Sequence, residues 1–254
     1  MSTPDALDAA SQLLLSTWLA GEAIDGIPEG IRPSTRGEGY AVQALTRQRN
    51  GSPLFGWKIA ATSIDGQKHI GVDGPLAGGI MSNRVIPDGG TVPPGPNRMA
   101  VAEVEFAFRM GIDLPPRDRP YEREEVVAAI GTLHPAIEVP DSRYENFVTV
   151  GAPQLIADMA CAHWFVLGPA APDSWRDLDL ASYTAAGTVT GKIQRQGVGS
   201  NVLGDPLVAL TWLVNELRGL GITLHKGEVV TTGTCLRPME IAAGDEVVAD
   251  FGAL

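Results

Sequence analysis

Apolar residues are spaced as on one face of a helix in four segments of the chain, two near its N-terminus, one in the middle and one towards its C-terminus. This spacing predicts four helices, over residues 5–19, 34–50, 122–133 and 205–219. Ser34 is suited to cap the second helix, and Asn50-Gly51 would end it. The fourth helix has the clearest start, because Asp205 can serve as N-cap and Pro206 occupies the first helical position.

Short apolar runs separated by Gly and Pro predict strands over much of the remaining chain. The predicted strands cover residues 54–60, 77–81, 101–110, 135–139, 229–232 and 246–251, with a hairpin over 183–198 and a further apolar segment over 156–167. No internal repeat or long linker divides the sequence. We therefore expect an α+β fold that is effectively one domain, in which a helical segment, residues 1–52, packs on a β-rich core, residues 53–254.

One of these strands, VAEVEFAFRM at residues 101–110, carries two acidic residues in an alternating pattern. Glu103 and Glu105 share one face, whereas Val104 and Phe106 point the other way, into a core. Neighbouring carboxylates repel each other unless a cation lies between them, and Mg²⁺ prefers such oxygen ligands. The alternative, which is the commoner case for this spacing alone, is a half-buried strand with a solvated acidic face.

A third acidic residue, Glu138, lies in the apolar strand of HPAIEVPDSRY. An unpaired charge in such a strand is unfavourable. Pairing with Arg143, or exposure to solvent, would account for Glu138 taken alone. Taken together with Glu103 and Glu105, it favours a three-carboxylate metal site with open positions for a substrate.

Two further segments offer polar groups. Lys58 lies in the middle of the strand LFGWKIA, where a lysine either snorkels from a sheet edge or is held near an anion. In the second case it could stabilise an enolate or transfer a proton. The sequence TTGT at residues 231–234 predicts a polar turn that presents hydroxyl and N–H groups to a carboxylate.

The charge balance narrows the classes of function. The chain has 30 acidic and 19 basic residues among 254, a formal net charge of −11, which opposes binding to nucleic acid and to anionic membranes. It has two cysteines, Cys161 and Cys235, and its start lacks the basic residues of a signal peptide. No apolar run is long enough to span a membrane. We therefore expect a cytoplasmic protein with no nucleic-acid or membrane partner.

Motifs of several other enzyme classes are missing. The sequence contains no GxGxxG, P-loop, GxSxG or CxxC motif, which argues against nucleotide binding and serine-hydrolase chemistry. His69 and His134 have no second metal ligand at helical spacing, so we expect both to be structural. The acidic residues are therefore the strongest candidates for chemistry.

Seven motifs, taken in order, resemble those of one known group of proteins. They are GYAVQ (39–43), GWKIAATS (56–63), GVDGPLAGGI (71–80), EVEFAF (103–108), AIEVPDSR (136–143), NVLGDPLVALTWLVNEL (201–217) and TTGT (231–234). Over nearly its whole length the chain resembles the fumarylacetoacetate hydrolase superfamily and, within it, the 2-keto-4-pentenoate hydratase and 4-oxalocrotonate decarboxylase branch. One departure is ADMACAHW at 157–164, which replaces a more polar segment of the family.

The resemblance implies a fold and a set of site residues. The implied fold is a mixed β-roll of curved strands, of the fumarylacetoacetate hydrolase C-terminal type, with N-terminal and peripheral helices, in a homo-oligomer. The implied cofactor is Mg²⁺ or Mn²⁺. The implied site residues are the metal ligands Glu103, Glu105 and Glu138, the catalytic residues Lys58 and Asp73, and the substrate-binding residues Thr234 and Ser63.

The activity implied by the resemblance is that of a lyase in aromatic catabolism. The first expectation is a hydratase that adds water to a 2-hydroxy-2,4-dienoate (2-keto-4-pentenoate type) and forms a 4-hydroxy-2-oxo acid. A 2-oxo acid can chelate one metal ion through its carboxylate and keto oxygens, and the ion then acts as a Lewis acid. Expected partners are other copies of the chain, a related hydratase or decarboxylase, or a downstream aldolase.

Three alternatives to the hydratase are a 4-oxalocrotonate-type decarboxylase, an acylpyruvate-type C–C hydrolase and a non-catalytic partner subunit. The hydrolase is disfavoured because His69 has no accompanying glutamate between Ser63 and Pro75. A non-catalytic subunit is disfavoured because Lys58 and all three carboxylates are present.

Overall fold

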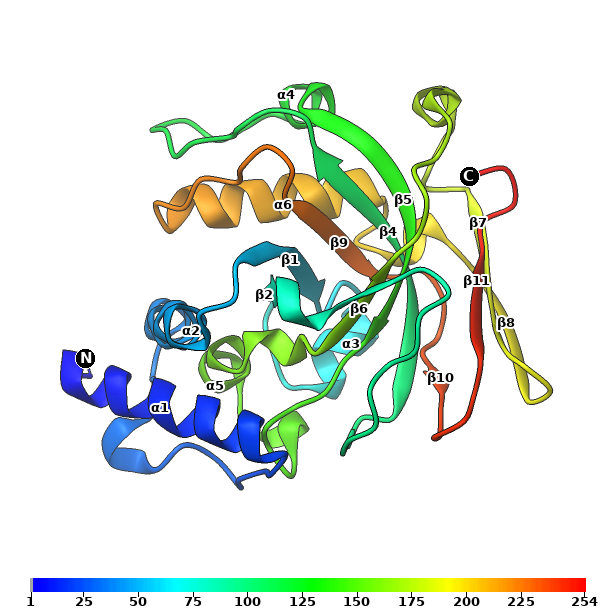
Figure 1. The fold of residues 1–254 in the computed structure, drawn as a ribbon. Helices are drawn as coiled ribbons and strands as arrows, with labels where there is room; N and C mark the ends of the chain where they lie inside the picture. Colours follow the sequence, from blue (N-terminus) through cyan, green and yellow to red (C-terminus); the bar gives the residue numbers. More distant parts are fainter. Residues whose placement is uncertain (1) are drawn as a thin grey trace.

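The structure is a computed structural model that describes residues 2–254 (Figure 1). Its α-helices are α1 (Pro4–Ala20), α2 (Arg36–Asn50), α3 (Ile64–His69), α4 (Arg123–Ala128), α5 (Ala152–Ala157) and α6 (Pro206–Gly219). Its strands are β1 (Leu54–Ala60), β2 (Leu76–Met81), β3 (Val85–Pro87), β4 (Val101–Met110), β5 (Ile130–Val139), β6 (Trp164–Leu167), β7 (Thr184–Val189), β8 (Ile193–Val198), β9 (Val229–Thr234), β10 (Met239–Glu240) and β11 (Val247–Asp250).

A curved mixed sheet forms the centre of the molecule (Figure 1). Its strand order is β2-β1-β9-β4-β5-β6-β3, and β10 pairs with β4. Most neighbouring strands are antiparallel, but β1 runs parallel to β9 and β3 runs parallel to β6. The β7–β8 hairpin and β11 form a second, three-stranded sheet. The expected α+β class, with a β-rich core and peripheral helices, is therefore confirmed.

Strand β4 is buried on both of its faces. Phe106 and Phe108 belong to the main hydrophobic core together with Leu213 of α6. On the other face, Glu105 and Ala107 are both 0% exposed. The alternative of a solvated acidic face is therefore wrong, because the acidic face of β4 is turned into the protein.

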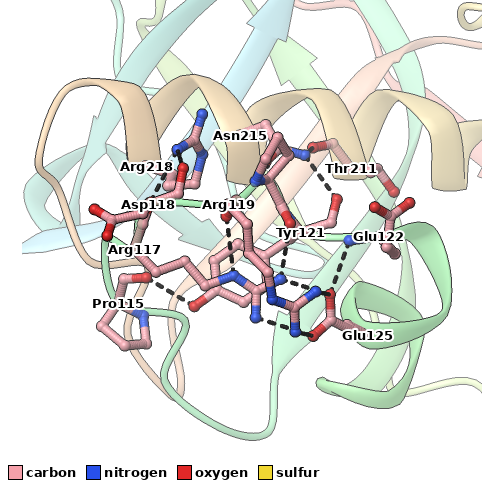
Figure 2. Close-up of polar contacts among 11 residues, drawn as sticks. Pro115, Arg117, Asp118, Arg119, Tyr121, Glu122, Glu125, Thr211, Asn215 and Arg218 are labelled. Carbon is pink, nitrogen blue, oxygen red and sulfur yellow. Dashed lines mark hydrogen bonds and ion pairs between the residues drawn. The ribbon is translucent and has the colours of Figure 1, made fainter.

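Polar contacts attach the segment before α4 to α6 (Figure 2). The Asn215 side chain accepts a hydrogen bond from the Tyr121 N–H at 2.8 Å and donates one to the Tyr121 carbonyl at 3.0 Å. Arg218 donates to the Arg117 carbonyl at 2.9 Å, while the Arg117 guanidinium donates to Glu125 and lies over the Tyr121 ring. These contacts hold the outer surface of α6, whose other side packs in the main core.

The helix predicted over residues 122–133 is too long. Helix α4 ends at Ala128, and β5 begins two residues later. Ile130 is paired with Met110 and Leu133 with Phe108, both on β4. Pairing with a neighbouring strand therefore overrides the local helical pattern, which is a tertiary effect that spacing along the chain does not contain.

Two smaller predictions also need correction. Thr35, rather than Ser34, caps α2, because the Thr35 hydroxyl accepts from the Glu38 N–H at 3.2 Å, whereas Ser34 donates to the Glu38 carboxylate. Residues 231–234 belong to strand β9 rather than to a turn. Thr231 is paired with Lys58 of β1 and with Ala107 of β4, and after an irregularity in the register Thr234 is paired with Glu105 of β4.

The N-terminal helices pack on the sheet through a buried glutamine of α2. The Gln43 amide donates to the carbonyl oxygens of Ala77 at 3.0 Å and Ile156 at 2.8 Å, and accepts from the Gly79 N–H at 3.2 Å. These bonds connect α2 to β2 and α5. The division into residues 1–52 and 53–254 stays a prediction, and Met1 lies outside the described residues. Within residues 2–254, no helix combines the length and the apolar character needed to cross a membrane.

Gly56→Ala should destabilise the junction of β1 and β9. A Cβ atom on Gly56 would lie 1.9 Å from the carbonyl oxygen of Val229, its partner in the parallel pair. We expect the free energy of unfolding, measured by urea denaturation, to fall by about 1–3 kcal/mol. Gly30→Ala is the control, because an added Cβ there meets nothing within 4 Å. Equal stability of the two variants would contradict the close approach of the strands.

Candidate metal centre and active site

Three carboxylates from two neighbouring strands converge inside the sheet. Glu103 and Glu105 alternate along β4, and Glu138 on β5 lies directly opposite Glu103 in the antiparallel register. One carboxylate oxygen of each residue lies within 4.8 Å of the others. Glu105 and Glu138 are 0% and 1% exposed, while Glu103 is only partly buried. The structure thus brings together the three predicted metal ligands and leaves the most accessible side of the group at Glu103.

Lys58 joins this group from β1, a strand that pairs with neither β4 nor β5. The Lys58 Nζ lies 3.1 Å from Glu138 Oε1, although β9 and β4 separate β1 from β5. The curvature of the sheet brings the two side chains together. Because β1 lies between β2 and β9 and Lys58 is 3% exposed, a lysine that snorkels from an edge is excluded.

The alternative partner of Glu138 is also excluded. Arg143 pairs with Asp158 rather than with Glu138, and both partners of that pair are buried. The Lys58 Nζ additionally donates a hydrogen bond to the carbonyl oxygen of Ala160 at 3.0 Å. The lysine is therefore fixed between a carboxylate and a backbone carbonyl.

The hydrogen bonds of the carboxylates leave several buried oxygens without a donor. Glu105 Oε2 accepts from the Thr231 hydroxyl and, at 2.9 Å, from the Gly233 N–H. Among the described residues, Glu105 Oε1 and both carboxylate oxygens of Glu138 have no hydrogen-bond partner, and the only positive group beside Glu138 is the Lys58 ammonium, an ion-pair partner 3.1 Å from Oε1. Buried oxygens normally have partners. Unpaired carboxylate oxygens that converge on one point are the donor set of a hard divalent cation.

The charges of the group lead to the same conclusion. Burial raises the pKa of Glu105 well above its ordinary value and also raises the pKa of Glu103. Burial raises the pKa of Glu138 to about 7 even though Lys58 opposes the shift. Burial alone would lower the pKa of Lys58, but Glu138, Glu103 and Glu105 raise it overall. Three carboxylates and one ammonium leave an excess of two negative charges, which a divalent cation would neutralise.

Of the two predicted substrate-binding residues, Thr234 lies beside this group, whereas Ser63 lies at the start of α3. Thr234 on β9 is opposite Glu105 in the register, and its hydroxyl donates to the Leu236 carbonyl at 2.7 Å. Ser63 caps α3, accepting from the Gly66 N–H at 3.0 Å. Ser63 also lines a cavity of about 390 Å³, whose lining residues are Thr62, Ser63, Ile64, Ser200, Asn201, Leu203 and Gly204. One lining residue, Thr62, packs against Gly233, whose N–H donates to Glu105, but the lining includes neither Lys58 nor any of the three carboxylates.

Asp73 is not brought to the carboxylates. It lies in the loop between α3 and β2, its side chain is 87% exposed, and it contacts Arg36 at 3.5 Å. Its catalytic role stays a prediction from the family resemblance. Sequence reasoning, for its part, missed Ala160 as a partner of Lys58, because a backbone carbonyl has no signal in the residue type.

The fold and the site together define a class of protein. The family model described as "Fumarylacetoacetate (FAA) hydrolase C-terminal" matches residues 75–254, and the chain belongs to this family. The chain is 29% identical over 246 residues to the 2-keto-4-pentenoate hydratase of Paraburkholderia xenovorans (strain LB400), covering 96% of this chain and 90% of that protein. It is 30% identical over 241 residues to 2-keto-4-pentenoate hydratase 1 of Dechloromonas aromatica (strain RCB), covering 94% and 90%.

Among solved structures, the chain is similar to the 4-oxalocrotonate decarboxylase from Pseudomonas putida G7 complexed with magnesium and adipate. The TM-score is 0.86 at 26% identity, and the match covers 98% of this chain and 94% of that one. The expected superfamily, its hydratase and decarboxylase branch and the fold are therefore confirmed.

The pKa shifts predict an unusual pH dependence for the metal-free protein. The native state holds protons on the buried carboxylates up to higher pH than the unfolded chain, since burial raises the pKa of Glu138 from 4.5 to about 7. The free energy of unfolding should therefore fall as pH rises through this window, by up to about 1.4 kcal/mol per pH unit for each such group. Urea denaturation in EDTA at several pH values measures this.

Glu138→Gln is the control for this pH dependence, because it removes one of the titrating groups. The difference in unfolding free energy between wild type and variant should change with pH from 4.5 to about 7. Added Mn²⁺ should stabilise the wild type more at higher pH, since it binds deprotonated carboxylates. A difference that does not vary with pH would contradict the shift.

Proposed function

We propose that the chain is a divalent-metal-dependent lyase: a hydratase that adds water to a 2-hydroxy-2,4-dienoate of the 2-keto-4-pentenoate type and forms a 4-hydroxy-2-oxo acid. The observation that carries the proposal is the group of three carboxylates beside the buried ammonium of Lys58. The names of the hydratases that align with more than nine-tenths of the chain support it.

In this proposal Glu103, Glu105 and Glu138 hold Mg²⁺ or Mn²⁺. The donor set consists of oxygen atoms only, which suits both ions. When bound, such an ion supplies a Lewis acid for the carboxylate and keto oxygens of a 2-oxo acid. The hydrogen bonds from Thr231 and Gly233 to Glu105 Oε2 orient that carboxylate and leave its Oε1 for the ion.

The proposed role of Lys58 follows from its contacts. The Ala160 carbonyl accepts one of its three N–H groups, and Glu138 is its ion-pair partner at 3.1 Å, which leaves an N–H for a substrate oxygen. The ammonium is buried, so water does not screen it from the negative charge that develops on the C2 oxygen of the substrate. A lysine in this position can then transfer a proton to the carbon chain as water adds at C4.

We rank hydration above decarboxylation because the aligned hydratases cover 96% and 94% of the chain, whereas an aligned 4-oxalocrotonate decarboxylase of Pseudomonas putida covers 87%. The related decarboxylase binds the dicarboxylate adipate in its crystal structure. A 4-oxalocrotonate-type decarboxylase is our second candidate, because loss of CO₂ would place the same negative charge beside Lys58. An acylpyruvate-type hydrolase and a non-catalytic subunit rank below both.

We also propose that the enzyme works in the cytoplasm as a homo-oligomer. Two free, buried cysteines, Cys161 and Cys235, suit a reducing compartment. Association with a related hydratase or decarboxylase, or with a downstream aldolase, belongs to the same proposal. Size measurement of the purified protein in solution tests the homo-oligomer directly.

Glu105→Gln should abolish the proposed reaction while the fold is kept. The variant loses one negative charge from the group, and we expect both Mn²⁺ affinity and kcat to fall by more than about 100-fold. The assay incubates metal-loaded protein separately with 2-hydroxypenta-2,4-dienoate and 4-oxalocrotonate. Product analysis then distinguishes added water from released CO₂.

Glu29→Gln is the matched control, because Glu29 is exposed on a short turn outside the site. It should keep wild-type activity and metal affinity. Full turnover of the dienoate by Glu105→Gln would refute the metal role of Glu105. Release of CO₂ from 4-oxalocrotonate without hydration of the dienoate would favour the second candidate.

A further inference from the structure

Three consecutive residues next to Lys58 adopt a backbone conformation that L-residues seldom use. Met159, Ala160 and Cys161 have φ angles of 54°, 49° and 65°, in the left-handed region. Such a conformation is unfavourable for a residue with a Cβ atom and persists only where the surroundings enforce it. A run of three, none of them glycine, therefore needs a structural cause.

The cause is a buried ion pair that binds the turn at both ends. The Arg143 guanidinium pairs with the Asp158 carboxylate and donates to the Asp158 carbonyl. It also donates to the Ala162 carbonyl, on the other side of the turn, at 3.2 Å. The Ser142 hydroxyl donates to Asp158 Oδ2 at 2.8 Å. One planar guanidinium thus connects the residues that precede and follow the left-handed turn.

The turn is also pressed against the strand beside Lys58. Gly78 on β2 is the partner of Lys58 in the register, and a Cβ atom on Gly78 would lie 1.8 Å from the Met159 carbonyl oxygen. The missing side chain lets the turn approach β2 closely at the position paired with Lys58. In this position the Ala160 carbonyl accepts the hydrogen bond from Lys58 Nζ at 3.0 Å.

The geometry points to Arg143 as a positioning residue for Lys58. With Asp158 it fixes the left-handed turn, and the turn holds the Ala160 carbonyl where it directs the Lys58 ammonium towards Glu138. The Arg143 side chain makes its hydrogen bonds to Asp141, Asp158 and Ala162 rather than to the three carboxylates, and it acts on Lys58 only through the turn. The catalytic consequence of this arrangement rests on the function proposed above, whereas the arrangement itself does not.

The competing explanation is that the Arg143–Asp158 pair stabilises the fold and nothing more. Buried ion pairs often have such a role, and breaking one destabilises a protein wherever it lies. The two explanations differ in what happens to Lys58 in a variant that still folds. A positioning role predicts that the Lys58 amine becomes mobile, whereas a purely structural role leaves it fixed.

Arg143→Lys tests this difference, because it keeps a positive charge for Asp158 but loses the planar fork that reaches Ala162. The readout is the rate of reductive methylation of Lys58 by formaldehyde and cyanoborohydride in metal-free protein, measured by mass spectrometry relative to the exposed Lys226. We expect the relative rate to rise about fivefold or more. In metal-loaded protein we expect kcat to fall about 10- to 100-fold, with KM and Mn²⁺ affinity nearly unchanged.

Val126→Ala is the control for lost stability, because Val126 is a buried residue of α4 outside the site. It should leave Lys58 methylation and kcat as in wild type. Methylation of Lys58 in Arg143→Lys that is no faster than in this control overturns the proposal. If Arg143→Lys does not fold, Ser142→Ala takes its place. It removes the hydrogen bond to Asp158 and the one that Ser142 accepts from the Tyr144 N–H, and we expect a smaller rise in the Lys58 methylation rate.

Failure of the proposed function and failure of the positioning role give different experimental results. A wild-type protein that binds no Mn²⁺ and hydrates no dienoate refutes that function, but the methylation rates still report whether Arg143 fixes Lys58. Conversely, unchanged methylation in a fully active enzyme refutes the positioning role alone.

Discussion

The concentration of negative charge inside the sheet is the constraint on which the rest of the site depends. Glu103, Glu105 and Glu138 are drawn together by the pairing of β4 with β5, and two of them are almost fully buried. Buried carboxylates so close together are unfavourable without a cation. Lys58 supplies one positive charge and leaves a place for a divalent ion. The fold therefore leaves a net negative charge that a divalent ion would neutralise.

The curvature of the sheet is what makes this arrangement geometrically accessible. Lys58 and Glu138 lie on strands separated by two others, and a flat sheet would keep their side chains far apart. A close backbone approach at Gly56 lets β1 pack tightly against β9, and one at Gly78 lets β2 pack tightly against the left-handed turn. Glycines on β1 and β2 therefore help to place Lys58 beside the carboxylates even though they have no functional groups.

Part of this site could be predicted from local sequence. Alternation along residues 101–110 placed Glu103 and Glu105 on one face, and the apolar surroundings of Glu138 indicated a charge that needs a partner. That Glu138 lies opposite Glu103 depends on strand pairing between distant segments, which spacing does not encode. The need of Glu138 for a partner grouped it with Glu103 and Glu105, and the family resemblance placed all three at metal-ligand positions, but neither predicted the register.

Other features were beyond local reasoning for identifiable physical reasons. The helix expected to reach residue 133 gives way to β5 because strand pairing outweighs helical spacing. The Ala160 carbonyl binds Lys58 through the backbone, so its residue type carries no signal. Asp73, expected near the substrate, is exposed and contacts Arg36. The structure therefore brings together Glu103, Glu105 and Glu138, whose role as metal ligands stays a prediction, as does the catalytic role of Asp73.

The most direct test of the account is a crystal structure of the Mn²⁺-loaded protein with anomalous scattering measured at the manganese absorption edge. The account predicts one strong anomalous peak within coordination distance, about 2.0–2.3 Å, of carboxylate oxygens from Glu103, Glu105 and Glu138. The absence of a peak at these three residues, or a peak that lies elsewhere while Glu105 and Glu138 keep their positions, would show that they do not hold the ion.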